Sequence, residues 1–117
     1  MIKAFRTTKT TFMKTCCVTG HRPQGFPFDH ENENAHAHII YTHMLYERVE
    51  ELIRGGYTDF ITGMAKGVDL DFACAVIYHK TVTFRDILDI SLEAAIPHPN
   101  QTRGWSDRYL DQYDYVL

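Results

Sequence analysis

Two short loops in this 117-residue chain carry residue types suited to binding a phosphate group. They read, in chain order, TGHRP (19–23) and TGMAKGVD (62–69). In the second loop, Gly63 and Gly67 let the backbone turn tightly and approach a ligand closely. The basic side chains of Arg22 and Lys66 can neutralise phosphate charge, and a guanidinium can do so with two parallel hydrogen bonds. The two loops therefore predict a phosphate-binding site.

Two further loop residues have more than one role open to them. Asp69 falls in the first turn of the helix expected after the second loop, where it can accept hydrogen bonds from a ribose or cap the helix. His21 has an ordinary pKa near neutrality, so it can act as a general base or donate a hydrogen bond to phosphate. We favour the donor role, because neither paired carboxylates nor a Ser-His-Asp arrangement accompanies it. No catalytic residue is assigned.

Strands and helices alternate around these loops. We expect strands at 14–19, 58–62, 91–96 and 113–117, helices at 34–54, 68–79 and 103–112, and a short helical turn at 83–89. Alternation of this kind predicts an α/β fold with helices packed on a parallel sheet. The expected architecture is a Rossmann-like, three-layer domain with a short parallel sheet of about four strands. Both loops would then open at the carboxyl ends of the strands, where such sheets bind ligands.

The chain divides into a short arm and one domain. Residues 1–13 are basic, rich in threonine and weakly patterned, so we expect a flexible arm or an irregular edge strand. Residues 14–117 form a single domain, which suits their length. Their clearest element is the helix at 34–54, whose apolar residues recur at helical spacing up to the Gly55-Gly56 stop.

Three blocks of sequence resemble the SLOG superfamily, and its branch of small YpsA-like bacterial and phage proteins in particular. They are CCVTGHRP (16–23), FITGMAKGVDLDFA (60–73) and LEAAIPHPNQTRGW (92–105), the last followed by Arg108, Tyr109 and Asp114. The resemblance covers about nine-tenths of the chain. It implies a Rossmann-like fold that binds nucleotides or nucleotide-derived small molecules. The superfamily also includes the LOG and DprA proteins.

The resemblance also implies which residues line the ligand site. Matched position by position, they are Gly20, His21, Arg22, Gly63, Ala65, Gly67 and Asp69, with Gln101 and Trp105 in a segment near the same edge. The indole of Trp105 can stack on a base or lie in the core. Two departures limit the comparison: the LOG motif PGGxGTxxE is absent, and the domain is expected to lack the family's C-terminal part. Hydrolase activity is therefore not carried over.

Composition narrows the classes of partner. The formal net charge is −3 and the pI is about 6.1, which disfavours a duplex nucleic-acid binder. The three cysteines, two of them adjacent, make a poor disulfide framework, and with no leader or membrane-spanning stretch they favour the cytoplasm. His36 and His38 lie about 200° apart on the expected helix, so we predict no metal site and assign no cofactor.

These observations favour a non-catalytic module that binds a nucleotide or nucleotide-derived small molecule at the strand edge. One alternative is a phage or mobile-element protein that inhibits a host protein, such as a defence nuclease or CRISPR effector. An exposed sheet edge or helix face would serve that role, or a homodimer. A nucleotide-processing hydrolase is the second alternative.

Overall fold

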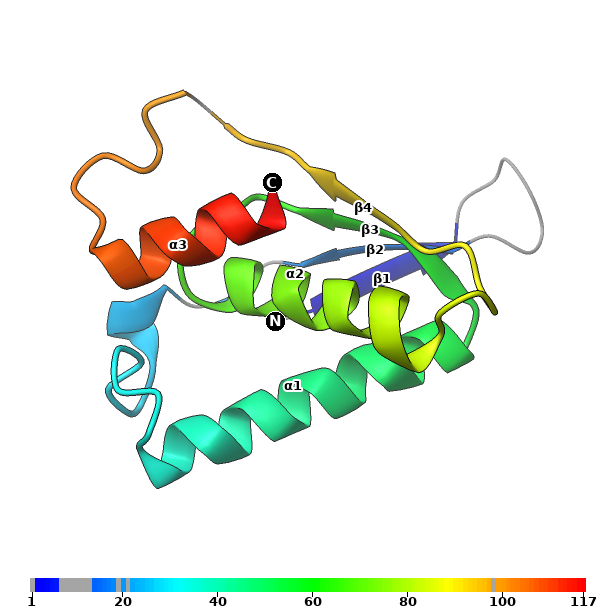
Figure 1. The fold of residues 1–117 in the computed structure, drawn as a ribbon, viewed down its shortest axis with the longest axis horizontal. Coiled ribbons are helices and arrows are strands. Elements are labelled where there is room, and N and C mark those ends of the chain that lie inside the picture. Colours follow the sequence, from blue (N-terminus) through cyan, green and yellow to red (C-terminus); the bar gives the residue numbers. More distant parts are fainter. Residues whose placement is uncertain (1, 7–13, 19, 21, 98) are drawn as a thin grey trace.

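The computed structural model describes residues 2–6, 14–18, 20, 22–97 and 99–117, with the backbone alone for 2–6. Its elements are β1 (Ile2–Arg6), β2 (Lys14–Val18), the 3₁₀ turn η1 (Pro23–Gly25), α1 (His36–Arg54), β3 (Tyr57–Thr62), α2 (Val68–Tyr78), the π-helical turn η2 (His79–Thr83), β4 (Ser91–Ala94) and α3 (Asp107–Val116). Figure 1 shows the strands side by side, with the arrows of β2, β3 and β4 directed toward the side where α3 begins and β1 running the opposite way. The fold is α/β, as the alternation of elements predicts.

The described strands form one mixed sheet in the order β1-β2-β3-β4. Strands β2, β3 and β4 are parallel, with Cys16 opposite Phe60 and Phe60 opposite Leu92. Strand β1 runs antiparallel to β2 and places Ile2 opposite Val18. The N-terminal segment therefore contributes an edge strand over Ile2–Arg6, while the expectation of a flexible arm at 7–13 lies outside the described residues. The parallel part of the sheet has three strands.

Both α1 and α2 cover the same face of this sheet. On that face Cys16 and Phe60 are buried and join a core with Leu45 and Val49 of α1 and Phe72 of α2. The intervening strand residues point the other way and are less covered. Consecutive parallel strands joined by right-handed crossovers place both connecting helices on one side. The described part of the chain therefore has two layers, and the expected third layer on the opposite face is wrong for these residues.

The strand expected at 113–117 is also wrong, because α3 continues from Asp107 through Val116. Tyrosine and valine favour strands locally, which made YDYVL read as one. In the structure Tyr109 is fully buried and contacts His30, in the loop before α1. Gln112 lies three residues later, and helical spacing brings its side chain to the same face of α3, where it reaches Asp71. Helix α3 begins later than the expected residue 103, since Gly104 has a φ of 80° and Ser106 is its N-cap.

The remaining expected elements are confirmed with small shifts at their ends. The strand expected at 91–96 ends at Ala94, and α2 passes directly into the π-helical turn. Within the segment 83–89, expected to form a short helical turn, the amides of Ile87 and Leu88 donate to the Phe84 carbonyl oxygen (3.0 and 3.3 Å) and close one turn. His79 holds the π-helical turn, since its ring lies 2.8 Å from the Tyr46 carbonyl oxygen and 2.7 Å from the Thr83 hydroxyl. None of the helices in the described parts of the chain is long and apolar enough to cross a membrane.

Removing a large side chain from this core should destabilise the domain. Phe72 is fully buried and its ring centroid lies 5.7 Å from that of Phe60. Phe72→Ala should lower the free energy of unfolding by about 3–5 kcal/mol, from the lost burial and the cavity left behind. Chemical denaturation followed by circular dichroism measures this. Ile87→Ala, at a side chain that is 72% exposed, is the control and should change the value by less than about 0.5 kcal/mol. Equal effects of the two substitutions would contradict the assigned core.

Candidate functional site

The loop between β3 and α2 has a fixed conformation built around Thr62. The buried Thr62 hydroxyl accepts a hydrogen bond from the Met64 amide (3.2 Å) and donates one to the Asp69 carbonyl oxygen (3.0 Å). Met64 has a φ of 63°, and Gly67, the N-cap of α2, has a φ of 101° and a ψ of −136°. The conformation at Gly67 is one that only glycine adopts readily. The conformation of the turn therefore requires a glycine at position 67, as the TGMAKGVD motif predicts.

Asp69 closes this loop from inside. A Cβ atom added to Gly63 would lie 3.0 Å from Asp69 Oδ2, so the carboxylate packs directly on the glycine. Burial raises the pKa of the Asp69 carboxyl, while the Ala65 backbone amide and the positive charge of Arg22 oppose that rise. Asp69 thus supplies the negative charge that the Ala65 amide binds. A phosphate arriving here has to be held mainly by cationic side chains.

The segment between β4 and α3 lies against the same loop. The Gln101 side-chain amide donates a hydrogen bond to the Gly63 carbonyl oxygen (3.1 Å). The Lys66 ammonium lies 5.9 Å from the ring centroid of Trp105 and 5.4 Å from that of Tyr109. The Gln101 and Trp105 contacts join the second and third blocks of the sequence, through residues about 40 positions apart, at the carboxyl ends of the strands.

The first loop is joined to them more loosely. Arg22 is exposed and lies close enough to Asp69 to lower the pKa of its carboxyl, as described above. Gly20 is exposed, and no described contact ties it to the other site residues. His21 lies outside the described residues. The structure therefore brings together Arg22, Lys66 and the Gly63–Asp69 loop, and it places Gly20 beside β2 without a defined role.

A buried polar cluster next to this loop was not found from the sequence. His30 Nε2 donates to Asp71 Oδ2 (2.6 Å), because a carboxylate can only accept. The hydroxyl of Tyr41 donates to the same oxygen (2.6 Å), and the Gln112 amide donates to Asp71 Oδ1 (2.7 Å). The Tyr109 hydroxyl lies 2.8 Å from His30 Nδ1 and can donate to it. One carboxylate thus links the loop at residue 30 with α1, α2 and α3.

The hydrogen bonds of this cluster hold His30 and Asp71 in place. The His30 side chain has no exposed surface and both of its nitrogens are engaged. Burial raises the pKa of Asp71, but the hydrogen bonds from His30, Tyr41 and Gln112 outweigh burial and hold the pKa below its ordinary value. One signal in the sequence pointed here: Asp71 is a charged residue on the buried side of the largely apolar helix VDLDFACAVIY. Nothing in the sequence named its partners.

Around the cluster lies a second, partly exposed layer. Arg108 donates to Glu33 (3.0 Å), and its guanidinium lies over the Tyr109 ring, 4.8 Å from the centroid. His38 is buried beside it, whereas His36 is exposed on another face of α1. Within the described parts of the chain, no three histidine, cysteine or acidic side chains are grouped so that they could hold a metal ion.

The cysteine thiols do not add a nucleophile. Burial raises the pKa of Cys16 and of Cys74 to about 11. Since the thiolate is the reactive form, neither side chain is activated at neutral pH. The described cysteines therefore supply no thiolate beside the loops, and the cations Arg22 and Lys66 are the described loop groups that can contact an anion.

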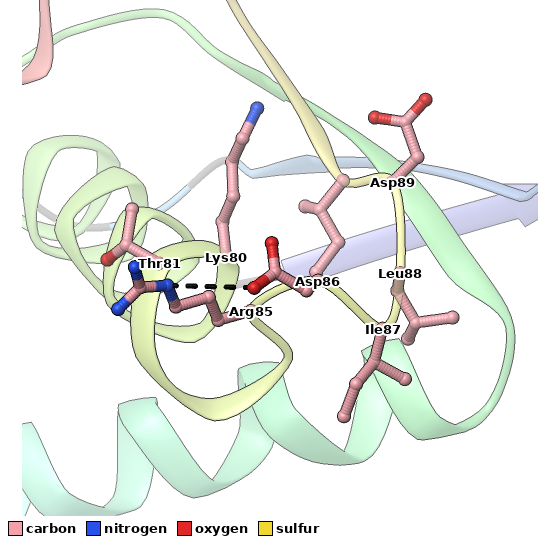
Figure 2. Close-up of a pocket in the computed structure, with 8 residues that line it drawn as sticks. Lys80, Thr81, Arg85, Asp86, Ile87, Leu88 and Asp89 are labelled. Atoms are coloured by element: carbon pink, nitrogen blue, oxygen red, sulfur yellow. Dashed lines mark ion pairs between the residues drawn. The ribbon is translucent and has the colours of Figure 1, made fainter.

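A surface hollow also lies at the opposite end of the sheet. It measures about 750 Å³ and is formed by the segment between α2 and the start of β4. Figure 2 shows Lys80 and Asp89 pointing away from Ile87 and Leu88, so the polar groups do not converge on one point. The ion pair drawn between Arg85 and Asp86 spans 3.8 Å between highly exposed side chains. Ligand sites need convergent polar groups, so size alone does not make this hollow one.

Comparison with known proteins found no match to this chain among protein-family models or among curated proteins.

The cluster predicts loss of stability in acid. Burial, followed by the charge of His30, lowers the pKa of His38 from its ordinary value of 6.5, against the opposing charges of Asp71 and Glu33. The unfolded chain therefore binds a proton at this position more readily than the folded one. The free energy of unfolding should fall as the pH drops below about 6.5 and through the lower pKa of His38. Protonation of Asp71 should remove more stability below its ordinary value of 3.8.

Thermal unfolding across this pH range measures the effect. His38→Gln should flatten the fall just below pH 6.5, because the titrating group is gone. His36→Gln removes an exposed histidine two residues away and should leave the profile unchanged. A His38→Gln profile that matched the original chain would show that His38 is not the group responsible.

Proposed function

We propose that this chain is a non-catalytic, SLOG-like module that binds a nucleotide or nucleotide-derived small molecule at the carboxyl edge of its parallel strands. One observation carries the proposal: the β3–α2 loop gathers Lys66 and Asp69 from its own residues, Gln101 and Trp105 from beyond β4, and the charge of Arg22 from beyond β2. The sequence blocks that resemble the SLOG superfamily contain all five residues. Rossmann-like sheets bind ligands at this edge.

Each side chain has a role in this proposal. Arg22 and Lys66 hold the phosphates, because Asp69 already occupies the Ala65 amide. Asp69 accepts a hydrogen bond from a ribose hydroxyl. Gln101 fixes the loop through the Gly63 carbonyl oxygen.

Trp105 positions Lys66 in this scheme. The Lys66 ammonium lies over the indole, and Tyr113 meets the same ring edge-on, with centroids 5.7 Å apart. An ammonium held on a ring is a weak interaction when exposed, so a phosphate can draw it away. Trp105 therefore keeps a cation near the loop and leaves the base to be bound elsewhere.

A protein-interaction role is the second candidate, and one observation favours it. The face of the sheet opposite α1 and α2 carries Cys17 and Ile61 without a helix over them in the described part of the chain. Strand β4 also has β3 as its one described neighbour. Such an edge suits a protein partner, a host nuclease or CRISPR effector among them, or a second copy. For either role we place the protein in the cytoplasm, because its cysteines make a poor disulfide framework.

The phosphate role predicts which cations matter. The combined substitution Arg22→Ala and Lys66→Ala should weaken nucleotide binding at least about tenfold, since each removes a charge-assisted contact. Isothermal titration calorimetry with ADP and with inorganic pyrophosphate measures it.

Arg85→Ala is the matched control. It removes an exposed arginine, 76% accessible in its side chain, at the other end of the sheet, so it should leave binding unchanged. If the folded original chain bound neither ligand, or if Arg85→Ala weakened binding as much as the double substitution, the proposed site would be wrong.

A further inference from the structure

An apolar groove runs along one side of α1, between that helix, Phe28 and the first residue of α2. It measures about 580 Å³, within the range of roughly 300–1,000 Å³ typical of small-molecule sites. The lining residues that matter here come from three segments of the chain: Phe28; Ile40, Tyr41, Met44 and Arg48; and Val68. Ile40 is 45% exposed and Met44 is 64% exposed, so the groove presents large apolar side chains to solvent. Exposed apolar surface of this extent usually marks a binding surface.

Two chain segments that line the groove also adjoin the loops of the candidate site. Val68 directly follows Gly67, and Phe28 lies in the segment that Arg22 begins. Helix α1 runs back along the sheet from the carboxyl edge, and Met44 lies eight residues after its start at His36, a rise of about 12 Å. The groove therefore starts on residues that adjoin the Arg22 and Lys66 loops in the chain, and it follows α1 away from the carboxyl edge.

The lining offers surface and almost no hydrogen bonding. The Tyr41 hydroxyl already donates to Asp71 (2.6 Å), so the ring is what Tyr41 presents to the groove. Arg48 is the one charged side chain among the described lining residues. It pairs with Glu51 at 3.2 Å where both side chains are more than half exposed, and such surface pairs exchange readily. A flat apolar body fits this lining better than a polar one.

We infer that this groove receives the base and ribose of the nucleotide whose phosphates lie at the strand edge. The inference rests on the proposed function and adds where the rest of the ligand lies. Because the described lining residues present ring faces and alkyl chains, contact is made through the flat face that every base has. The Arg48 guanidinium can donate a hydrogen bond to an acceptor atom on any of the bases. Binding is therefore indifferent to which base is present.

Isothermal titration calorimetry with the full chain measures the contributions of the phosphates and of the nucleoside to binding separately. The probes are inorganic pyrophosphate and ADP, GDP, CDP and UDP. The nucleoside diphosphates should bind about tenfold more tightly than pyrophosphate, and within about fivefold of one another, since stacking tolerates every base.

Met44→Glu places a charge in the groove at an exposed helical position, where folding tolerates it. It should reduce ADP affinity to that of pyrophosphate and leave pyrophosphate affinity unchanged. Ile87→Glu makes the same chemical change at a 72% exposed position at the other end of the sheet, and should alter neither affinity.

Three results would overturn the inference while the phosphate site stands. One is pyrophosphate binding as tightly as the four nucleotides. Another is a preference of more than about fiftyfold for one base, which would require specific hydrogen bonds. The third is a dimer, detected by sedimentation, that Met44→Glu dissociates and Ile87→Glu does not, because a second copy would then fill the groove. Failure of pyrophosphate and nucleotides alike to bind would overturn the proposed function as well.

Discussion

The carboxylate of Asp71 is the interaction on which the arrangement of this domain depends. It accepts hydrogen bonds from His30, Tyr41 and Gln112, which come from the loop before α1, from α1 and from α3. A buried carboxylate without partners would cost several kcal/mol, so the three donors have to stay in place while it is charged. Helix α3 packs against α2, and the Gln112 hydrogen bond to this carboxylate ties the two helices together.

The same constraint prepares the candidate site. Tyr109, which contacts His30, lies under Lys66, and Trp105 stands just before α3. Fixing α3 therefore holds Lys66 at the edge of the β3–α2 loop. Tyr41 lies between the cluster and the apolar groove, with its hydroxyl on Asp71 and its ring in the groove wall. The Asp71 cluster thus contacts both the residues around the β3–α2 loop and the wall of the groove, which is the physical basis of the two proposals.

Much of this framework could be predicted from the sequence, because its signals are local. The apolar run at 14–19 and the helical spacing up to residue 54 predict the strand and the helix that the structure has as β2 and α1. Gly63 and Gly67 were identified because a tight turn before a helix requires glycine, and the structure bears this out at Gly67 with a φ of 101°. The segment after residue 103 was harder. Tyr113 and Tyr115 favour a strand by local propensity, and only the burial of Tyr109 against His30 makes the segment a helix.

The sequence alone thus determined the alternation of strands and helices, the parallel pairing of β2, β3 and β4, and the glycine turn of the second loop. Each depends on backbone preferences and on spacing within a few residues. The tertiary structure decided that α1 and α2 share one face of the sheet, that Asp69 closes its own loop, and that Asp71 joins partners from residues 30, 41 and 112. Such contacts join residues up to about 40 positions apart in the chain. A charged residue on an apolar helix face can be recognised from the sequence, but the hydrogen-bond donors that pair with it cannot.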